Sequence, residues 1–303
     1  MDKLEEKISF FDALNQKLLI GDGAMGTMLQ AMGITQAPDI VNMDDRKIEK
    51  VIQVHLDYLN AGTDIIQTNT FGSNPVKLKS YNLEKEIRQV NSNAVFAAKE
   101  AIQLYQKDKR HKRRIFVAGS VGPLGALLEP SGNINYRQAL AFFTQQMEIL
   151  ADSGVDIILI ETIMDINEAY AAINAAKKTT DLPVICTMTF GANGVTVMGN
   201  KAEDSVKLLQ DKGADIVGAN CSLGSAAMLD IVKKMRNADK NAKLIFQPNA
   251  GLPLLKDGKT AYDETPQIIA ENISRYITYS PSIIGTCCGS TPQHIQKIIE
   301  LIS

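Results

Sequence analysis

The sequence predicts an α/β fold, a single-domain (β/α)8 barrel of the TIM type that spans residues 1–303. Short apolar runs rich in isoleucine and valine alternate with longer stretches of helical period along the whole chain. No linker-like stretch interrupts this alternation, and the chain is long enough for eight such units, since a barrel of this kind usually takes about 250 residues. An open sheet with a small second domain is the alternative.

Eight apolar runs are the predicted strands. Each run is apolar at consecutive positions, which is typical of parallel strands that are buried on both faces. The predicted strands are residues 18–23, 64–69, 115–120, 156–161, 183–189, 215–220, 244–248 and 282–286.

The stretches between the strands have the period of amphipathic helices. In residues 45–60, for example, Val51, His55 and Leu59 fall on one apolar face. The predicted helices are residues 45–60, 84–105, 136–152, 166–178, 202–211, 226–236, 266–276 and 292–302.

Three similar short segments recur at the same point of the strand–helix unit. Gly62, Gly154 and Gly213 each follow a predicted helix and come two residues before an aspartate that begins a predicted strand. Glycine is favoured just past a helix end, because it tolerates the left-handed conformation there. The recurrence supports a regular array of strand–helix units.

Composition and charge exclude several classes of protein. A net charge of −2 and a pI near 6.0 give no sign of a nucleic-acid or membrane partner. The one basic run, residues 107–114, lacks interleaved aromatic residues and is predicted to be a solvated loop. The charged N-terminus has no apolar signal core, and no apolar stretch approaches the roughly 20 residues of a membrane span. We therefore expect a cytoplasmic protein with reduced thiols.

Polar side chains gather where the predicted strands end. In a (β/α)8 barrel the chemistry lies at the carboxyl ends of the strands. Almost every predicted strand ends in a polar or metal-ligating side chain next to a glycine or another small residue. These side chains are Asp22, Thr68, Asn69, Ser120, Glu161, Thr189, Asn220, Cys221, Asn249, Cys287 and Cys288.

Three of the four cysteines predict a metal site. Cys221 closes the sixth strand, and the adjacent Cys287 and Cys288 close the eighth. Only the seventh strand separates the sixth from the eighth in the barrel, so the ends of these two strands can converge. The three thiolates then occupy three corners of a zinc tetrahedron, and the fourth is left for water or substrate. The alternative is that the cysteines are small buried apolar residues. Cys186 lies inside the fifth strand and is interpreted as core.

Two other features of the sequence carry less weight. Residues 21–26 match G-x-G-x-x-G, but Asp22 would face the pyrophosphate of a dinucleotide. We therefore interpret the segment as a tight turn that leaves Asp22 at the barrel mouth, with glycines that let a ligand approach the backbone. His55, His111 and His294 form no catalytic or metal-binding pattern, so the chemistry does not depend on a histidine base.

Taken together, the motifs resemble those of the homocysteine S-methyltransferase family, and in particular the N-terminal, homocysteine-binding module of cobalamin-dependent methionine synthase. The likeness covers nearly the whole chain in order, and the paired cysteines with the upstream Asn-Cys are its most specific part. The motifs are residues 21–26 (GDGAMG), 68–71 (TNTF), 119–123 (GSVGP), 161–162 (ET), 218–222 (GANCS), 247–251 (QPNAG) and 285–289 (GTCCG).

The resemblance implies a zinc-dependent methyltransferase that gives methionine from homocysteine. Cys221, Cys287 and Cys288 are then the zinc ligands and act in catalysis through the metal. The zinc deprotonates the homocysteine thiol, whose ordinary pKa is near 8.5, and the thiolate attacks the methyl carbon. Thr286 stands where many relatives have a second glycine, which leaves the ligands in place.

The resemblance also implies the residues that bind the amino-acid part of homocysteine. Asp22 and Glu161 hold the substrate ammonium group, and Asn220 lies beside the metal. A general acid/base pair as in glycosidases is the alternative for the two carboxylates. Thr70 and Ser120 mark the segments, residues 70–71 and 119–122, whose backbone N–H groups are candidates for binding the substrate carboxylate.

The methyl donor is left open by these motifs, which describe the acceptor side. Relatives use methylcobalamin, glycine betaine or S-methylmethionine. No D-x-H-x-x-G surrounds any histidine, and the chain stops right after the last predicted helix. The chain is then a fragment, or a module served by a separate corrinoid protein, or an enzyme that uses a free donor. Because the motifs resemble the methionine synthase module, we expect methylcobalamin carried by a separate corrinoid protein or module. The alternatives are a free donor and a zinc–thiol binding module that is not catalytic alone; a zinc hydrolase is disfavoured, because a thiolate-rich site makes the metal a weaker acid for water.

Overall fold

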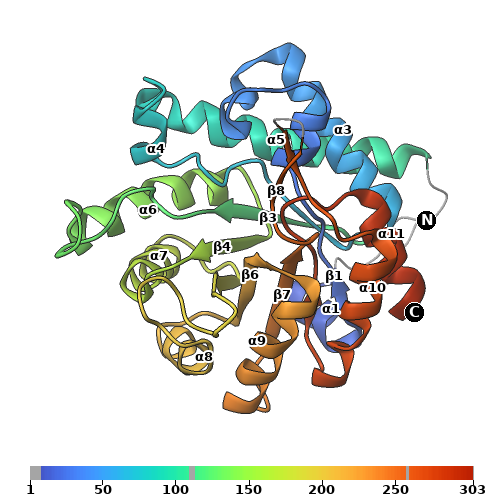
Figure 1. The fold of residues 1–303 in the computed structure, drawn as a ribbon. Coiled ribbons are helices and arrows are strands. Elements are labelled where there is room, and N and C mark those ends of the chain that lie inside the picture. The colour runs from blue at the N-terminus through green and yellow to red at the C-terminus, as the bar shows by residue number, and fades with distance from the viewer. Residues whose placement is uncertain (1–7, 109–112, 257–258, 303) are drawn as a thin grey trace.

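A computed structural model describes residues 8–108, 113–256 and 259–302, and eight parallel strands form a nearly closed barrel at its centre (Figure 1). The hydrogen-bonded order of the strands is β1-β10-β7-β6-β5-β4-β3-β2. A bridge between Gly21 and Ile65, with the Asp64 N–H donating to the Ile20 carbonyl at 2.7 Å, joins the first strand to the second. The strands are β1 (Leu19–Ile20), β2 (Ile65–Gln67), β3 (Phe116–Val121), β4 (Ile157–Ile163), β5 (Val184–Met188), β6 (Ile216–Gly224), β7 (Leu244–Asn249) and β10 (Ile283–Ile284).

The eight observed strands lie within or across the eight predicted runs, so the predicted barrel is confirmed. Their buried side chains alternate between two clusters. One cluster faces the barrel interior and includes Leu19, Phe116 and Ile157, whereas the other packs outward against the helices and includes Val117 and Ile158. Strands buried on both faces explain the continuous apolar runs of the sequence.

The helices surround the strands, as Figure 1 shows. The prediction of residues 84–105 as one helix needs a correction, because a 3-10 turn, η2 (Glu84–Glu86), precedes α5. The helices that match the prediction are α3 (Asp45–Ala61), α5 (Ile87–Asp108), α6 (Tyr136–Asp152), α7 (Ile166–Thr179), α8 (Ala202–Asp211), α9 (Ser225–Ala238), α10 (Pro266–Ser274) and α11 (Pro292–Ile302).

Several short elements escape the sequence prediction, because they are only three to seven residues long and show no clear helical period. They are α1 (Phe10–Gln16), α2 (Gly26–Ala31), η1 (Pro38–Met43), α4 (Pro75–Lys79) and η3 (Ile277–Tyr279). The helix α1 closes the amino end of the barrel: Phe10 and Ala13 are buried in the interior cluster, and the Phe10 ring meets Phe116 edge-on at 5.3 Å between centroids.

The three recurring segments, in which an aspartate follows a glycine by two residues, link neighbouring strands of the barrel. Asp64, Asp156 and Asp215 each accept a hydrogen bond from the backbone N–H of a residue in a neighbouring strand, at 2.8–3.0 Å. Each aspartate also pairs with a basic side chain. This segment recurs in the sequence because the same link between neighbouring strands is made at several places at the amino end of the sheet.

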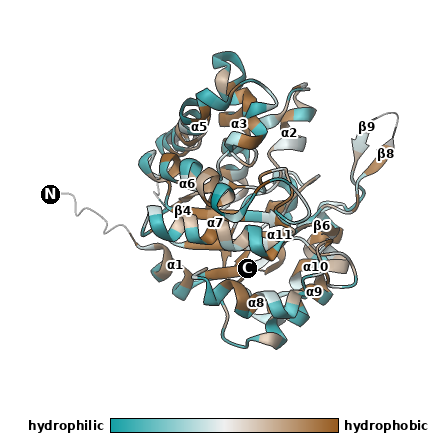
Figure 2. Ribbon diagram, turned by 90° about the vertical axis from the view of Figure 1, so that its left-hand side faces the viewer, coloured by the Kyte–Doolittle hydropathy of each residue, from teal (hydrophilic) through white to brown (hydrophobic). Residues whose placement is uncertain are grey.

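Two features differ from a regular barrel or from expectation. A hairpin, β8 (Leu254–Lys256) and β9 (Lys259–Ala261), follows β7 and projects from the barrel (Figure 2).

In the basic run, residues 109–112 lie outside the described residues. Arg113 and Arg114 do not belong to a solvated loop, because they form ion pairs with Asp64 and Asp156.

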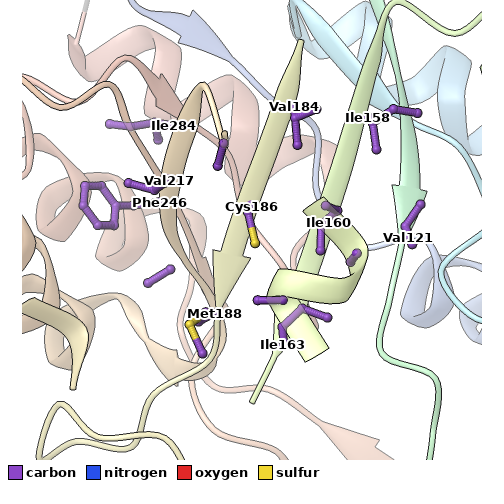
Figure 3. Close-up of a cluster of buried hydrophobic side chains, with 14 of the residues drawn as sticks. Val121, Ile158, Ile160, Ile163, Val184, Cys186, Met188, Val217, Phe246 and Ile284 are labelled. Atoms are coloured by element: carbon purple, nitrogen blue, oxygen red, sulfur yellow. The ribbon is translucent and has the colours of Figure 1, made fainter. Parts of the chain in front are cut away.

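The fourth cysteine is core, as predicted. Cys186 is fully buried in β5, and Figure 3 shows its side chain among those of Val184, Ile160 and Val217. Burial raises the pKa of its thiol, which keeps it protonated and inert.

None of the helices among the described residues has the length and apolar character that crossing a bilayer requires.

Candidate functional site

The three remaining cysteines converge at the carboxyl end of the barrel. Cys221 is in β6, and Cys287 and Cys288 follow β10 after Gly285 and Thr286. Their Sγ atoms lie within 4.8 Å of one another, and Cys288 Sγ is 3.9 Å from each of the other two. A tetrahedral zinc with Zn–S bonds of about 2.3 Å places its sulfur ligands about 3.8 Å apart. The cluster therefore fits zinc as three thiolate ligands.

The backbone around Cys221 has unusual dihedral angles. Thr162, Cys221 and Ser222 have positive φ values of 62°, 59° and 64°, which is rare for residues with a side chain. The ladder between β6 and β7 is irregular in the same place, between Asn220 and Gly224. Such strain persists where the surrounding structure fixes it, and it gathers at functional sites.

Asn220 is the group that fixes this backbone. Its Oδ1 accepts hydrogen bonds from the Thr162 N–H and the Thr187 hydroxyl, both at 2.8 Å. Its Nδ2 donates to Thr162 Oγ1 at 2.7 Å and to Glu161 Oε2 at 3.2 Å. The predicted neighbour of the metal site is therefore a buried link between β4, β5 and β6.

The cysteines hold their protons unequally in the absence of a metal. The pKa of Cys221 is lowered, because Cys287 and Cys288 donate hydrogen bonds to its sulfur. The pKa values of Cys287 and Cys288 are raised, since both thiols are held as donors to that sulfur. Metal binding by three thiolates requires the thiols to lose their protons, so the metal affinity of such a site depends on pH.

Asp22 is buried at the end of β1, with 2% of its surface exposed. Its Oδ2 accepts a hydrogen bond from the Gln67 N–H at 2.8 Å, while Oδ1 has no partner among the described residues. Burial raises the pKa of this carboxyl well above its usual range, and the charge of Glu161 raises it further. A buried carboxylate oxygen without a partner is suited to a cationic group of a ligand.

Glu161 lies in β4, near both Asp22 and the cysteines. Its Oε1 accepts a hydrogen bond from the Ser120 hydroxyl, and its Oε2 accepts one from Asn220. Burial raises the pKa of Glu161 to about 7, opposed by the Ser120 hydrogen bond and assisted by the charge of Cys221. The predicted pair of carboxylates and the cysteine cluster thus influence one another electrostatically.

Other predicted substrate groups are engaged within the protein. Ser120 orients Glu161 through its hydroxyl, and its N–H donates to Thr68 Oγ1 at 3.1 Å. Thr70 is fully buried and donates its hydroxyl to the Ser120 carbonyl at 2.7 Å. The N–H groups of Thr70 and Gly122 also donate to backbone carbonyls, whereas that of Phe71 has no partner in the described part of the chain. The Thr70 and Ser120 side chains thus have partners within the protein, and their contact with the substrate stays a prediction.

Further unsatisfied polar atoms gather at this end of the barrel. Buried atoms without a partner in the described ranges include Thr189 Oγ1, Gln247 Oε1 and Asn249 Oδ1, besides Asp22 Oδ1. Gln247 and Asn249 lie in β7, whereas Asp22 and Thr189 follow β1 and β5. Buried polar atoms are normally paired, so this concentration marks a place where a ligand supplies the partners.

Sequence reasoning missed two residues that lie beside the cysteines. The Asn249 side chain helps to lower the pKa of Cys221. The Tyr262 ring packs against Gly289, the residue after Cys288. Asn249 stood among the strand-end residues without a role. Tyr262 follows the hairpin that the sequence did not predict, so no signal could have placed it there.

The glycine-rich turn has a different purpose from the one expected. A Cβ on Gly23 would lie 2.4–2.8 Å from the side-chain oxygens of Ser290, Thr286 and Tyr58. The glycine therefore makes room for these side chains and not for a ligand. The turn still brings Asp22 to the mouth, as predicted.

The histidines stay outside the site, as far as the structure describes them. His55 is fully buried in α3, where burial lowers its pKa to about 4. His294 bonds to Thr291 and to the Glu264 carbonyl. His111 lies outside the described residues.

Comparisons with known proteins agree with this geometry. The chain matches the family profile described as homocysteine S-methyltransferase over residues 19–302. It is 30% identical to methionine synthase of Mycobacterium leprae over 309 aligned positions, and 29% identical to methionine synthase of Mycobacterium tuberculosis. The alignments cover 96% and 100% of this chain but only 25% and 26% of those proteins, so the chain spans about a quarter of their length.

Solved structures share the fold. The homocysteine methyltransferase MmuM from Escherichia coli, in its oxidized form, superposes with a TM-score of 0.81 at 23% identity, over 95% of this chain and 97% of that one. Its metallated form superposes with a TM-score of 0.77 at 24% identity, over 94% and 97%. Because the family profile covers nearly the whole chain, this protein belongs to the homocysteine S-methyltransferase family of enzymes.

Proposed function

We propose that this chain transfers a methyl group to the thiol of homocysteine and so forms methionine. The observation that carries the proposal is the convergence of three cysteine sulfurs, within 4.8 Å of one another, beside two buried carboxylates at the mouth of the barrel. A thiol substrate with an ammonium group matches both parts of this site.

Cys221, Cys287 and Cys288 are the proposed zinc ligands. A bound zinc lowers the pKa of a coordinated thiol, so that the substrate sulfur is held as a thiolate at neutral pH. The left-handed backbone at Cys221, fixed by Asn220, aims this ligand at the other two. Three ligands from the protein leave a fourth position for the substrate sulfur.

Asp22 and Glu161 are the proposed ammonium-binding residues. The unpartnered Asp22 Oδ1 accepts a hydrogen bond from the ammonium group. The positive charge of that group offsets the burial and the neighbouring negative charges that raise the pKa of both carboxyls. The Phe71 N–H, which has no partner among the described residues, is the donor best placed for the substrate carboxylate in the segments singled out by sequence.

We propose methylcobalamin, supplied by a separate corrinoid protein or module, as the methyl donor. The support is the likeness to methionine synthases of which this chain spans only a quarter. In the transfer, the sulfur lone pair forms the bond to the methyl carbon, and the electron pair of the broken bond stays with the donor. Free donors such as S-methylmethionine or betaine are the alternative.

The test is methionine formation, measured by mass spectrometry, from the zinc-loaded protein and homocysteine. Methylcobalamin, S-methylmethionine and betaine are supplied in parallel. Methionine from methylcobalamin alone supports both the reaction and the donor, while methionine from a free donor instead keeps the reaction and overturns the donor. If no donor gives methionine, the chain is a zinc–thiol binding module that is not catalytic alone.

A further inference from the structure

Gln247, in β7, is a buried residue whose side-chain amide has no evident role in holding the barrel together. It is 2% exposed, and its Oε1 has no hydrogen-bond partner in the part of the chain that the structure describes. Burying an amide oxygen without a hydrogen bond is unfavourable, and buried polar atoms are normally paired. The amide is therefore a group to which a ligand supplies the partner.

The strand β7 places this side chain inside the mouth of the barrel. Ile245 packs in the interior cluster, whereas Phe246 packs outward against the helices. Because side chains alternate along a strand, Gln247 faces the interior, one layer above Ile245 towards the carboxyl end. The strand is fixed at this point, since the Phe246 carbonyl accepts a hydrogen bond from the Gly285 N–H at 3.1 Å.

Gly285 brings the amide close to Asp22. A Cβ on Gly285 would lie 3.2 Å from Gln247 Nε2 and 3.3 Å from Gln247 Cγ, so the Gln247 side chain lies along this glycine. The same point is 3.0 Å from the backbone carbonyl oxygen of Asp22. The amide thus lies between β7 and the end of β1, beside the residue whose Oδ1 is also without a partner.

Asn220 connects Gln247 to the other carboxylate of the candidate site. Gln247 and Asn220 are paired in the ladder between β7 and β6. The Asn220 Nδ2 donates a hydrogen bond to Glu161 Oε2 at 3.2 Å. Gln247 therefore neighbours Asp22 directly and Glu161 through Asn220.

The chemistry of the unpartnered atoms indicates what kind of ligand group they bind. Gln247 Oε1 and Asp22 Oδ1 are both acceptors, so the ligand group must be a donor. A substrate carboxylate has no proton to donate at neutral pH, whereas an ammonium group has three N–H donors. Asp22 and Glu161 accept two of them in the proposed site, which leaves one for a third acceptor.

We propose that Gln247 is a substrate-binding residue whose Oε1 accepts the third N–H of the homocysteine ammonium group. The inference rests on the proposed function and adds a neutral acceptor to its ammonium site. A neutral amide suits this place, because a third carboxylate would add to the repulsion between Asp22 and Glu161. The amide would thus favour thiols that carry an ammonium group over those that lack one.

The test measures the binding of three thiols to the zinc-loaded protein by calorimetry under reducing conditions. Homocysteine has both charged groups, 4-mercaptobutanoate lacks the ammonium group, and 3-aminopropane-1-thiol lacks the carboxylate. The unaltered protein is compared with Gln247→Met and with Gln210→Met. The control makes the same replacement near the end of α8, where Gln210 Nε2 donates to Asp239 Oδ2 at 3.4 Å.

Loss of the amide is expected to affect only the ligands that carry an ammonium group. Gln247→Met is expected to bind homocysteine and 3-aminopropane-1-thiol about 10- to 100-fold more weakly, as is usual for the loss of a hydrogen bond to a charged group. Its affinity for 4-mercaptobutanoate is expected to equal that of the unaltered protein. Gln210→Met is expected to bind all three thiols as the unaltered protein does.

A second variant keeps an acceptor oxygen at this position. In Gln247→Glu, the affinity for 3-aminopropane-1-thiol relative to that for 4-mercaptobutanoate is expected to rise, since a carboxylate attracts the ammonium group and repels the ligand carboxylate. This variant serves even where Gln247→Met fails to fold. A ratio that stays the same or falls overturns the proposal.

The Tm of the metal-free proteins gives a readout that separates a binding role from a structural one. Methionine is close to glutamine in size and needs no hydrogen-bond partner, so Gln247→Met is expected to keep or raise the Tm measured by scanning calorimetry. A Tm that falls by several degrees shows that the amide has partners within the protein, and overturns the inference.

The binding outcomes distinguish this inference from the proposed function. Equal binding of homocysteine by Gln247→Met and the unaltered protein overturns the role of Gln247 and leaves the function standing. A loss confined to the two thiols with a carboxylate assigns the amide to that group, and overturns the proposal as well. An unaltered protein that binds none of the three thiols contradicts the proposed function itself.

Discussion

Asn220 joins the two halves of the candidate site at the level of single residues. It contacts Glu161 through Nδ2, and it holds the left-handed Thr162 through both amide atoms. The next residue along the chain is Cys221. The proposed ammonium site and the proposed metal site are therefore built on one rigid group, and each is expected to respond when the other is altered.

Removing one cysteine tests the ligand assignment. Cys287→Ala leaves two thiolates, so we expect loss of zinc and of methionine formation, while the barrel stays folded because the cysteine cluster is not part of either barrel core. Metal content is measured by elemental analysis and folding by circular dichroism. A variant that retains both zinc and activity would contradict the assignment. Cys186→Ala, in the core, is the matched control and keeps its zinc.

Neutralising Asp22 tests the ammonium site. Asp22→Asn keeps an oxygen to accept the Gln67 hydrogen bond but loses the charge. A hydrogen bond to a charged group contributes about 1.5–3 kcal/mol, so we expect KM for homocysteine to rise about 10- to 100-fold. Zinc affinity, measured on the same samples, is expected to change far less. Unchanged KM would remove Asp22 from the substrate site.

The raised pKa of Glu161 makes ligand binding depend on pH. Its pKa of about 7 means that the carboxyl is neutral below pH 7 and charged above it. Binding of methionine, which has the ammonium group but no titratable thiol, is expected to tighten as pH rises through about 7. Calorimetry at pH 6 and pH 8 measures this change, and Glu161→Gln removes it. A slope that persists in Glu161→Gln would assign the effect to another group.

The raised pKa of Glu161 also makes the free energy of unfolding depend on pH, but this free energy falls as pH rises. The folded-state pKa of Glu161 lies above its unfolded value, so the folded protein binds a proton more tightly. Its contribution is complete below the unfolded pKa of about 4.3 and is lost as pH rises through about 7. In the unaltered protein, the free energy of unfolding is therefore expected to fall between these two pH values. In Glu161→Gln it is expected to fall less, as measured by urea denaturation of the metal-free protein.

At the level of elements, α1 is the part of the fold that seals the amino end of the barrel. Phe10 is 5% exposed and packs in the interior cluster, whereas its neighbour Phe11 is 37% exposed. The other end of the barrel is left to the loops that carry the cysteines and Tyr262. The amino end of the barrel thus contributes to stability, and the carboxyl end carries the candidate site.

Truncating Phe10 tests this division. Replacement of a buried phenylalanine by alanine costs about 3–5 kcal/mol, so Phe10→Ala is expected to lower the unfolding free energy by about that amount. Phe11→Ala is the matched control, and its effect is expected to be much smaller. Both are measured by urea denaturation. Zinc affinity of folded Phe10→Ala stays unchanged if the two ends are independent.

At the level of the whole molecule, the proposed zinc site unites distant segments. Cys221 and Cys288 are 67 residues apart in sequence, and Asp22 is farther still from either. The unfolded chain does not hold these groups together, so zinc at this site would bind the folded state selectively. We therefore expect the metal to stabilise the folded barrel.

Removal of the metal tests this coupling. A ligand at 100 times its Kd stabilises the folded state by about 2.7 kcal/mol. Scanning calorimetry is expected to show a Tm that is lower by several degrees after chelation and that recovers when zinc is added back. Cys287→Ala, which lacks a ligand, is expected to show no such response. A Tm of the unaltered protein that is insensitive to chelator and zinc would contradict the coupling.

The sequence by itself determined the barrel and the three cysteines that converge at its carboxyl end. Apolar runs and helical periods reflect local burial, which depends on neighbours in sequence, and they located all eight barrel strands. The polar strand ends singled out Asp22, Glu161 and the cysteines, because parallel strands bring their carboxyl ends to one face.

Only the tertiary structure decided which groups are free to bind and which are already engaged. Thr70 and Ser120 are occupied by hydrogen bonds to β2, β3 and β4, and Gly23 makes room for side chains from the last barrel unit. Tyr262, which follows a hairpin that no sequence pattern predicts, packs against Gly289 next to Cys288. Hydrogen-bond partners and close packing arise between segments distant in sequence, and a residue type alone does not specify them.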